Sequence, residues 1–269
     1  MSLSRNKERL LARLKGGRSR AKEGLFVVEG VRGSEEALAR DAEVRFAVCS
    51  SRLQHSDRGL QLARRLEAAV GDLVWVDEGI LEAVAHTETP QGVLLVCAEP
   101  SFTLSDLADR EAREPGEGPS SLRLLVLDGI QDPGNLGGLI RGAAAFGLDG
   151  VVALPGTVDP WNSKAVRACA GTCFAIPVVR ASGDEFFQWA RTHDLPVLVA
   201  DMAGEPVRVM DVRGWALVIG SEAEGPSAAA REAAAELVAV PMAGAVESLN
   251  AAMAGGILMF ALTRGSGGR

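Results

Sequence analysis

Three short stretches of the sequence place amide, carboxylate and hydroxyl groups beside glycines at the ends of apolar runs, and an arginine follows the first of them. They are "DGIQDPGN" (128–135), "IGSEAEGPS" (219–227) and "VPMAGAVESLN" (240–250). Such groups can orient a hydroxyl-bearing substrate and bind phosphate, and the glycines let a ligand approach the backbone. The candidate residues are Asn135 with Arg141, Gly220 with Glu222, and Ser248 with Asn250.

The first stretch fits neither of the two familiar nucleotide-binding patterns. Its glycines, at 129, 134, 137 and 138, lack the G-x-G-x-x-G spacing of a dinucleotide-binding turn. The spacing from Gly129 to Gly134 matches the start of a Walker A loop, but Asn135 stands where that loop needs lysine. A nucleotide-dependent oxidoreductase, one alternative that an α/β pattern suggests, therefore lacks its glycine fingerprint.

Each stretch alone also has a purely structural interpretation. Asn135 can cap a helix, and Arg141, about 600° further around that helix, can be an ordinary surface residue. Ser248 can likewise be an N-cap. Gly255 and Gly256 lie inside the last helical segment, where each costs about 1 kcal/mol relative to alanine. They predict close packing there, in an oligomer interface or in a tight intramolecular crossing.

Composition describes a soluble globular protein of two domains. The 269 residues are 47% hydrophobic and 23% charged, with a net charge of −7. No apolar run approaches the ~20 residues of a membrane span, and no signal peptide is recognisable, so a cytoplasmic location is expected. The four cysteines show no Cys-x-x-Cys spacing and the three histidines are scattered, so no metal site is expected.

Charge and periodicity suggest how the chain is organised. Residues 1–22 hold eight Lys or Arg against one acidic residue and form either a phosphate-binding arm or a frayed terminus. Residues 23–99 alternate β-rich and helical runs, which predicts a small α/β domain. Residues 100–121 are expected to be a linker. From 122 to 265, continuously apolar runs between helical segments predict a parallel sheet, whose ligand site lies at the carboxyl ends of its strands.

Taken together, the three stretches resemble, in order and spacing, the three motifs of the SpoU (TrmH-type) RNA 2′-O-ribose methyltransferases of the SPOUT superfamily. The matching residues are Asn135 and Arg141 in the first motif, Gly220, Glu222 and Gly225 in the second, and Pro241, Ser248, Leu249 and Asn250 in the third. The resemblance covers about residues 122–265. The upstream domain is similar to the small α/β (ribosomal-protein L30e-like) RNA-binding domain of many members, through "FVVEG" and "TPQGVLLV".

This resemblance implies a C-terminal trefoil knot that forms a pocket for S-adenosylmethionine. Backbone at Gly220 and Val240 and the side chain of Leu249 are then expected to line the pocket. The resemblance also implies that Arg141 acts as the base. Because a guanidinium stays protonated in proteins, the alternative is that Arg141 anchors an RNA phosphate and stabilises developing charge. The other implied roles are positioning of Arg141 or the ribose by Asn135, shaping of the loop by Glu222, and support of the third motif and the target nucleotide by Ser248 and Asn250.

The implied function is methylation of a ribose 2′-hydroxyl in RNA, with 23S ribosomal RNA favoured over tRNA. The 2′-hydroxyl distinguishes RNA from DNA, which fits an RNA substrate. Family members are generally homodimers whose active site is completed across the interface, so a homodimer without metal or membrane partners is expected. A non-catalytic RNA-binding or ribosome-assembly protein on the same fold is the alternative. The target nucleotide, and a housekeeping or antibiotic-resistance role, stay open.

Overall fold

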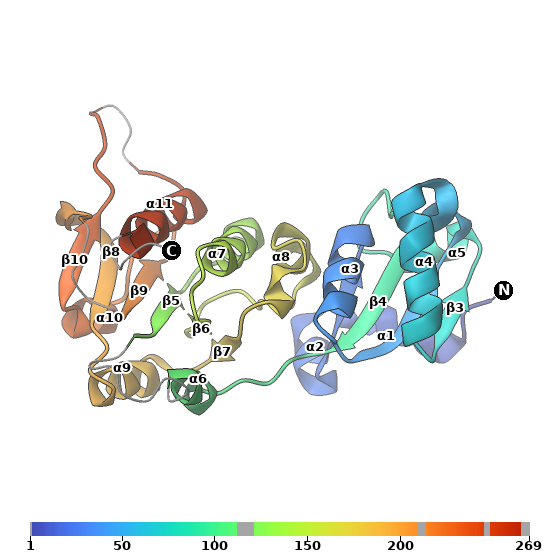
Figure 1. Cartoon of the computed structure of the whole chain (residues 1–269), viewed down its shortest axis with the longest axis horizontal. Helices are drawn as coiled ribbons and strands as arrows, with labels where there is room; N and C mark the ends of the chain where they lie inside the picture. Colours follow the sequence, from blue (N-terminus) through green and yellow to red (C-terminus); the bar gives the residue numbers. More distant parts are fainter. Residues whose placement is uncertain (1, 112–120, 209–213, 245–247, 265–269) are drawn as a thin grey trace. The chain divides into compact units, whose positions relative to one another are not determined.

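The chain forms two β-sheets, each at the centre of its own unit (Figure 1). The computed structural model describes residues 2–111, 121–208, 214–244 and 248–264. The N-terminal unit contains Met1–Pro100 and Asp159–Ala175, and the C-terminal unit contains Ser101–Val158 and Ile176–Arg269.

The N-terminal unit is a small α/β domain with a four-stranded sheet in the order β1-β4-β2-β3. Strand β4 pairs antiparallel with β1 and β2, and β2 pairs parallel with β3. Its elements are α1 (Arg5–Leu14), α2 (Gly17–Glu23), β1 (Leu25–Glu29), α3 (Val31–Ala39), β2 (Val44–Cys49), the 3-10 helix η1 (Ser51–His55), α4 (Asp57–Ala69), β3 (Leu73–Trp75), α5 (Glu78–Val84), β4 (Val93–Ala98), α8 (Ser163–Ala168) and the 3-10 helix η2 (Thr172–Phe174).

The basic N-terminal segment is folded rather than frayed. Helix α1 begins after Ser4, whose side chain accepts a hydrogen bond from the Lys7 backbone, and it buries Leu11 and Leu14 in the core of the unit. Some of the expected positive charge is neutralised by ion pairs, because Lys7 pairs with Asp72 and Arg13 with Glu23. Five exposed basic side chains in this segment have no ion-pair partner among the described residues: Arg5, Arg9, Lys15, Arg18 and Lys22.

The segment Asp159–Ala175 is part of the N-terminal unit although it lies within the range expected to form the methyltransferase domain. Arg20, which is 6% exposed, donates to Asp159 through Nε at 2.7 Å and to the Leu14 carbonyl oxygen through Nη1 at 2.8 Å. The rings of Phe26 and Trp161 lie 4.7 Å apart, and both are buried. A buried ion pair and an aromatic pair thus hold this segment in the unit.

The C-terminal unit contains a six-stranded parallel sheet in the order β10-β8-β9-β5-β6-β7. This confirms the parallel sheet predicted from the continuously apolar runs. Its elements are α6 (Leu104–Glu111), β5 (Arg123–Asp128), α7 (Pro133–Ala145), β6 (Gly150–Ala153), β7 (Val178–Arg180), α9 (Gly183–Thr192), β8 (Val197–Pro206), β9 (Trp215–Gly220), α10 (Ala228–Ala233), β10 (Glu236–Ala239) and α11 (Ala251–Arg264).

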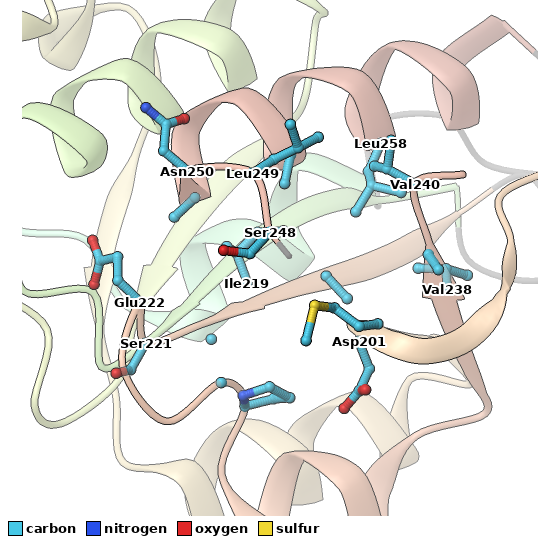
Figure 2. A pocket seen from close by; sticks show the side chains of 18 of the residues that line it. Asp201, Ile219, Ser221, Glu222, Val238, Val240, Ser248, Leu249, Asn250 and Leu258 are labelled. Carbon is cyan, nitrogen blue, oxygen red and sulfur yellow. The ribbon is translucent and has the colours of Figure 1, made fainter. Parts of the chain in front are cut away.

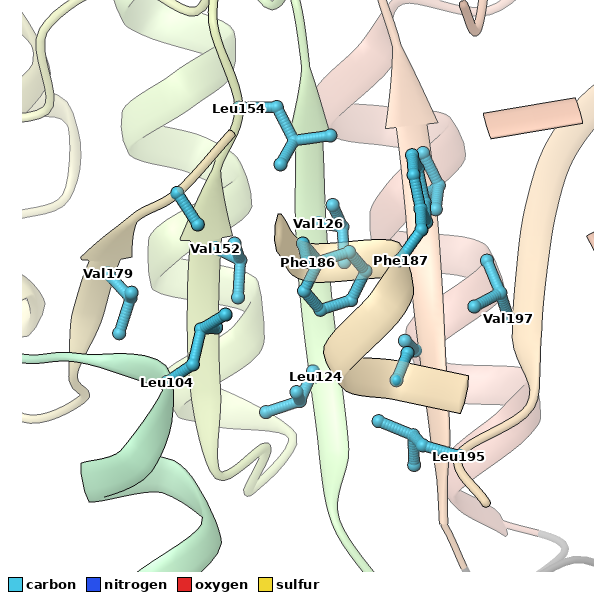
Figure 3. Packing of buried hydrophobic residues seen from close by; sticks show 14 of the residues in the cluster. Leu104, Leu124, Val126, Val152, Leu154, Val179, Phe186, Phe187, Leu195 and Val197 are labelled. Carbon is cyan, nitrogen blue, oxygen red and sulfur yellow. The ribbon is translucent and has the colours of Figure 1, made fainter. Parts of the chain in front are cut away.

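Helices cover both faces of this sheet, as apolar parallel strands require. On one face, Leu124 and Val126 of β5 and Val152 of β6 pack with Phe186 and Phe187 of α9 (Figure 3). Side chains from α6 and α10 join the same cluster. The other face carries α7 and α11, which pack against each other and against the central strands. The sheet edge that carries the strand ends is thereby fixed between two helical layers.

The crossing of α7 and α11 explains one of the two glycines inside the last helix. A Cβ added to Gly255 would lie 2.3 Å from Leu139 Cδ2, and Leu139 is fully buried. A Cβ added to Gly256 would have no atom within 4 Å. Gly255 therefore serves a tight intramolecular crossing, one of the two interpretations that the sequence left open.

Part of the expected linker belongs to the C-terminal unit. Leu104 and Leu107, three residues apart, anchor α6 in the core cluster, whereas 112–120 lie outside the described residues. Sequence periodicity missed this helix because it is short and has only two buried apolar positions. The strand order does not test the trefoil knot, which stays a prediction.

Candidate functional site

A pocket of about 640 Å³ opens at the carboxyl ends of β9 and β10, beside the middle of β8 and the start of α11 (Figure 2). All three backbone and apolar positions expected to hold a cofactor, Gly220, Val240 and Leu249, line it. Apolar side chains of Ile219, Val238 and Leu258 extend the same wall, and the polar lining includes Glu222, Ser248 and Asn250. The pocket thus joins two of the three stretches singled out in the sequence.

Gly220 is required by the turn that follows β9. A Cβ at this position would lie 2.1 Å from the Pro226 nitrogen, so only glycine lets the chain return so closely. Ser221 and Gly225 close the turn through two reciprocal backbone hydrogen bonds of 3.0 and 2.9 Å. The Asp128 carboxylate at the end of β5 then accepts a 2.7 Å bond from the Ser227 backbone. This wall of the pocket is therefore fixed by backbone contacts.

Glu222 links the second stretch to the first. Its Oε1 accepts a 2.9 Å hydrogen bond from the Asn135 side chain, and its two oxygens accept from the backbone N–H groups of Gln131 and Asp132 at 3.2 and 3.4 Å. Partial burial acts to raise the pKa of Glu222, but the hydrogen bonds from Asn135 and the backbone outweigh it and lower that pKa below its usual value. The carboxylate is therefore held ionised beside the pocket.

Asn135 does not cap helix α7, so the purely structural interpretation of this residue is wrong. Asp132 is the N-cap, and its Oδ1 accepts a 2.8 Å bond from the Asn135 backbone N–H. Pro133 occupies the first helical position, where its missing N–H costs nothing. The aspartate before this proline gave the signal that would have identified the cap. The Asn135 side chain is consequently free to bind Glu222.

Arg141 lies outside this constellation within one chain. It is exposed on α7, is not among the residues that line the pocket, and has no hydrogen-bond or ion-pair partner among the residues that the structure describes. Six residues separate it from Asn135, which places the two side chains on different faces of the helix, as expected from helix geometry. The guanidinium is therefore available for a group supplied from outside the chain.

In the third stretch, Asn250 rather than Ser248 caps helix α11. The Asn250 Oδ1 accepts a 2.7 Å hydrogen bond from the Met253 backbone. Ser248 instead lies in the middle of the lining, between Glu222 and Val240 (Figure 2). Glu247, the residue before Ser248 in this stretch, lies outside the described residues.

Sequence reasoning missed an ion pair on the opposite wall of the pocket. Asp201 of β8 and Arg231 of α10 both line the pocket and pair with each other across 30 positions of sequence. No local pattern links residues so far apart. Within the described ranges, no group of three His, Cys, Asp or Glu side chains could hold a metal ion. In the same part of the chain, no helix is long and apolar enough to cross a membrane.

Comparison with known families assigns the chain. Residues 123–260 match the SpoU rRNA Methylase family, and residues 6–95 match the MRM3-like substrate binding domain. The chain therefore belongs to the SpoU rRNA methylase family. This confirms the family and the methyltransferase class predicted from the three stretches, and it confirms a substrate-binding domain upstream.

Full-length relatives and solved structures agree with this assignment. The chain is 32% identical to the 23S rRNA (guanosine(2553)-2′-O)-methyltransferase RlmP of Bacillus subtilis over 91% of each chain. It is similar to an AdoMet-bound rRNA methyltransferase from Sinorhizobium meliloti, with a TM-score of 0.82, 29% identity, and 98% and 96% of the two chains covered. The SpoU methyltransferase AviRb of Streptomyces viridochromogenes, solved with AdoMet, gives a TM-score of 0.82 at 26% identity, with 97% and 98% covered.

Proposed function

We propose that this protein transfers a methyl group from S-adenosylmethionine to a ribose 2′-hydroxyl of ribosomal RNA, with 23S ribosomal RNA favoured over tRNA. The observation that carries the proposal is the pocket lined by Gly220, Val240 and Leu249, with Glu222 and Asn135 joined at its edge. Relatives named as 23S rRNA 2′-O-methyltransferases and neighbours solved with AdoMet support the substrate and the cofactor.

The lining residues fit this cofactor. A volume of about 640 Å³ is in the range of small-molecule sites, and the apolar wall of Ile219, Val238 and Leu249 suits a ligand with an aromatic ring and an aliphatic chain. The closed turn after Gly220 offers backbone groups at the pocket surface. The bound cofactor supplies an electrophilic methyl group on a sulfonium, and the chain must align the ribose oxygen with it and accept the hydroxyl proton.

Asn135 and Glu222 position the reacting groups, because their hydrogen bond fixes the start of α7 against the turn that lines the pocket. Arg141 binds an RNA phosphate and stabilises developing charge, with the hydroxyl proton leaving through that phosphate or water. Arginine side chains stay protonated in proteins, which favours this role over that of general base. The Ser248 hydroxyl and the side-chain amide nitrogen of Asn250 hold the target nucleotide.

The active enzyme is a homodimer in which Arg141 of one protomer serves the pocket of its partner. Two observations support this arrangement. Arg141 does not line the pocket of its own chain. Helix α11 also exposes an apolar face of Met253, Ile257 and Phe260, at positions one and two turns apart. A second copy that covers this face would bury these side chains and bring α7 of each protomer to the interface.

The N-terminal unit binds the RNA, and the protein acts in the cytoplasm on ribosomal RNA. The match to a substrate binding domain supports the first statement. The exposed basic side chains of α1 and α2, for example Arg9 and Arg18, provide phosphate contacts that weaken with salt. Because Arg20 is buried, it takes no part in these contacts.

The decisive experiment measures methyl transfer from radiolabelled S-adenosylmethionine to total ribosomal RNA and tRNA from a strain that lacks this protein. The wild-type enzyme and Arg141→Ala are compared, with Arg208→Ala, which removes a different exposed arginine, as the matched control. Label in 23S ribosomal RNA that is lost only with Arg141→Ala would support the proposal. RNA binding without any uptake of cofactor would instead identify a non-catalytic RNA-binding or assembly protein.

A further inference from the structure

The pairing between strands β8 and β10 is interrupted for five residues of β8 beside the pocket. Val199 of β8 pairs with Leu237 of β10, and the next residue of β10, Val238, pairs with Glu205. Residues 200–204 of β8 therefore have no pairing partner in β10. A Cβ added to Gly204 would lie 2.6 Å from the Leu237 carbonyl carbon, so glycine is needed where the two backbones meet again. We call residues 200–204 the β8 bulge. Because it has no room to lie flat against β10, it must project from the sheet.

The β8 bulge forms a wall of the pocket through Ala200, Asp201 and Met202. Met202 is 72% exposed, although it is large, apolar and part of the lining. Within the bulge, the Asp201 Oδ1 accepts a 2.9 Å hydrogen bond from the Ala203 backbone, which closes a tight local turn. An exposed methionine held on a structured turn at the pocket edge is suited to contact a ligand.

A single arginine ties the β8 bulge to the turn on the adjacent wall. Arg231 of α10 pairs with Asp201, whose side chain is only 9% exposed, and its Nε donates to the Pro226 carbonyl oxygen at 3.3 Å. Pro226 closes the turn that starts at Gly220. Figure 2 shows Asp201 on the side of the pocket opposite Leu249 and Asn250. Arg231 thus connects two walls that are distant in sequence.

We propose that Met202 is a cofactor-contacting residue and that Asp201 and Arg231 are positioning residues that hold it over the bound cofactor. This inference rests on the proposed function, because it takes S-adenosylmethionine as the ligand. On binding, the exposed thioether of Met202 becomes covered by the apolar part of the ligand. Breaking the Asp201–Arg231 pair makes the β8 bulge mobile. Part of the binding free energy of the cofactor is then used to order the bulge, and the affinity falls.

The test is equilibrium binding of S-adenosylmethionine by isothermal titration calorimetry, together with hydrogen exchange of residues 197–206. Met202→Ala raises Kd about fivefold and Met202→Leu less, because leucine keeps most of the contact area. Arg231→Gln and Asp201→Asn each raise Kd about tenfold, and the double variant raises it no further, since the two side chains act as one unit. In the wild type, cofactor slows exchange in the β8 bulge, and this protection is lost in Arg231→Gln.

Matched controls separate positioning from general destabilisation. Leu60→Ala removes an exposed apolar side chain of the N-terminal unit, and Arg208→Ala, just beyond the end of β8, breaks the ion pair with Glu236 at the start of β10. Both bind cofactor like the wild type. Apo melting temperatures identify any variant that weakens the fold as a whole. Unchanged Kd in Met202→Ala and Arg231→Gln, with a wild type that binds cofactor, overturns the inference. A wild type that binds no cofactor overturns the proposed function instead.

Discussion

Glu222 and Asn135, 87 positions apart in sequence, are joined by a 2.9 Å hydrogen bond between a carboxylate oxygen and an amide nitrogen. The same carboxylate receives two backbone N–H groups at the start of α7. One ionised side chain therefore fastens the start of helix α7 to the turn that lines the pocket. Charge-assisted hydrogen bonds of this kind are stronger than neutral ones, so substitution of either residue should have a measurable effect.

Glu222→Gln is expected to lower kcat/KM for methyl transfer by about tenfold, because it removes the charge and replaces one acceptor oxygen with a donor. Asn135→Ala acts through the same bond, so the double variant is expected to be less impaired than the product of the two effects. Steady-state kinetics with ribosomal RNA measures all three. Glu232→Gln, at an exposed glutamate of α10 that does not line the pocket and has no side-chain hydrogen bond among the described residues, is the control. Strict multiplicativity of the two effects would contradict a shared function.

The pH dependence of stability gives a second test of Glu222. Its pKa in the folded state is lowered from the usual 4.5, so ionisation stabilises the fold above that value, and this contribution is lost as the pH falls through the folded pKa. Because the side chain is largely exposed, the effect is expected to stay under about 1 kcal/mol. Urea unfolding of the wild type and Glu222→Gln should differ at pH 7 and converge near pH 3. A difference that grows towards low pH would show the opposite sign.

The neighbouring glycines of α11 are expected to respond in opposite directions to the same substitution. Gly255→Ala forces a methyl group against buried Leu139 and is expected to destabilise the protein by about 1–3 kcal/mol. Gly256→Ala meets no atom within 4 Å and should stabilise the helix by up to about 1 kcal/mol. Thermal unfolding of the two variants compares them directly. Equal losses of stability would mean that both glycines face a close neighbour.

The exposed apolar face of α11 predicts the effect of charge on assembly. Ile257→Asp is expected to convert a dimer into a monomer, because a carboxylate cannot be buried unpaired in an apolar interface. Methyl transfer should fall by more than about tenfold while cofactor binding changes little, since Ile257 does not line the pocket. Light scattering and calorimetry report the two properties separately. The control is Leu60→Asp, at a 37% exposed leucine of the N-terminal unit. A dimeric Ile257→Asp variant would exclude this face as the interface.

Breaking the buried pair of Arg20 and Asp159 should destabilise the N-terminal unit. Asp159→Asn leaves the Arg20 guanidinium, 6% exposed, without its counter-charge, a change that typically costs about 3–5 kcal/mol. Hydrogen exchange in α1 and α2 is expected to accelerate strongly. Asp41→Asn, which changes an exposed aspartate of the same unit, should leave exchange unaltered. Unchanged exchange with Asp159→Asn would show that the aromatic contact alone holds the segment.

Patterns that depend on one strand or one turn predicted the structure well. Continuously apolar runs identified the parallel sheet, because strands covered on both faces need apolar side chains at every position. The strand ends marked by Gly220 and Val240 meet at one pocket, as the common direction of parallel strands requires. Their catalytic and binding roles, together with that of Arg141, stay predictions.

Contacts between distant segments were beyond sequence reasoning. No sequence pattern near Asp201 indicates that its ion-pair partner is Arg231. The β8 bulge likewise depends on how β8 pairs with β10, which its own residues do not reveal. The structural alternative, in which Asn135 is the cap, was wrong because two polar residues compete at that helix start. The geometry of Pro133 decides in favour of Asp132.

Because Asp159–Ala175 belongs to the N-terminal unit, the protein cannot be divided into its two units at one point of the chain. A fragment made of residues 1–100 would carry Phe26 without the Trp161 ring and Arg20 without its carboxylate. Because the missing pieces come from the middle of the chain, no single cut yields both units whole. Transfer of the N-terminal unit to another methyltransferase therefore requires two segments, residues 1–100 and residues 159–175, rather than one contiguous module.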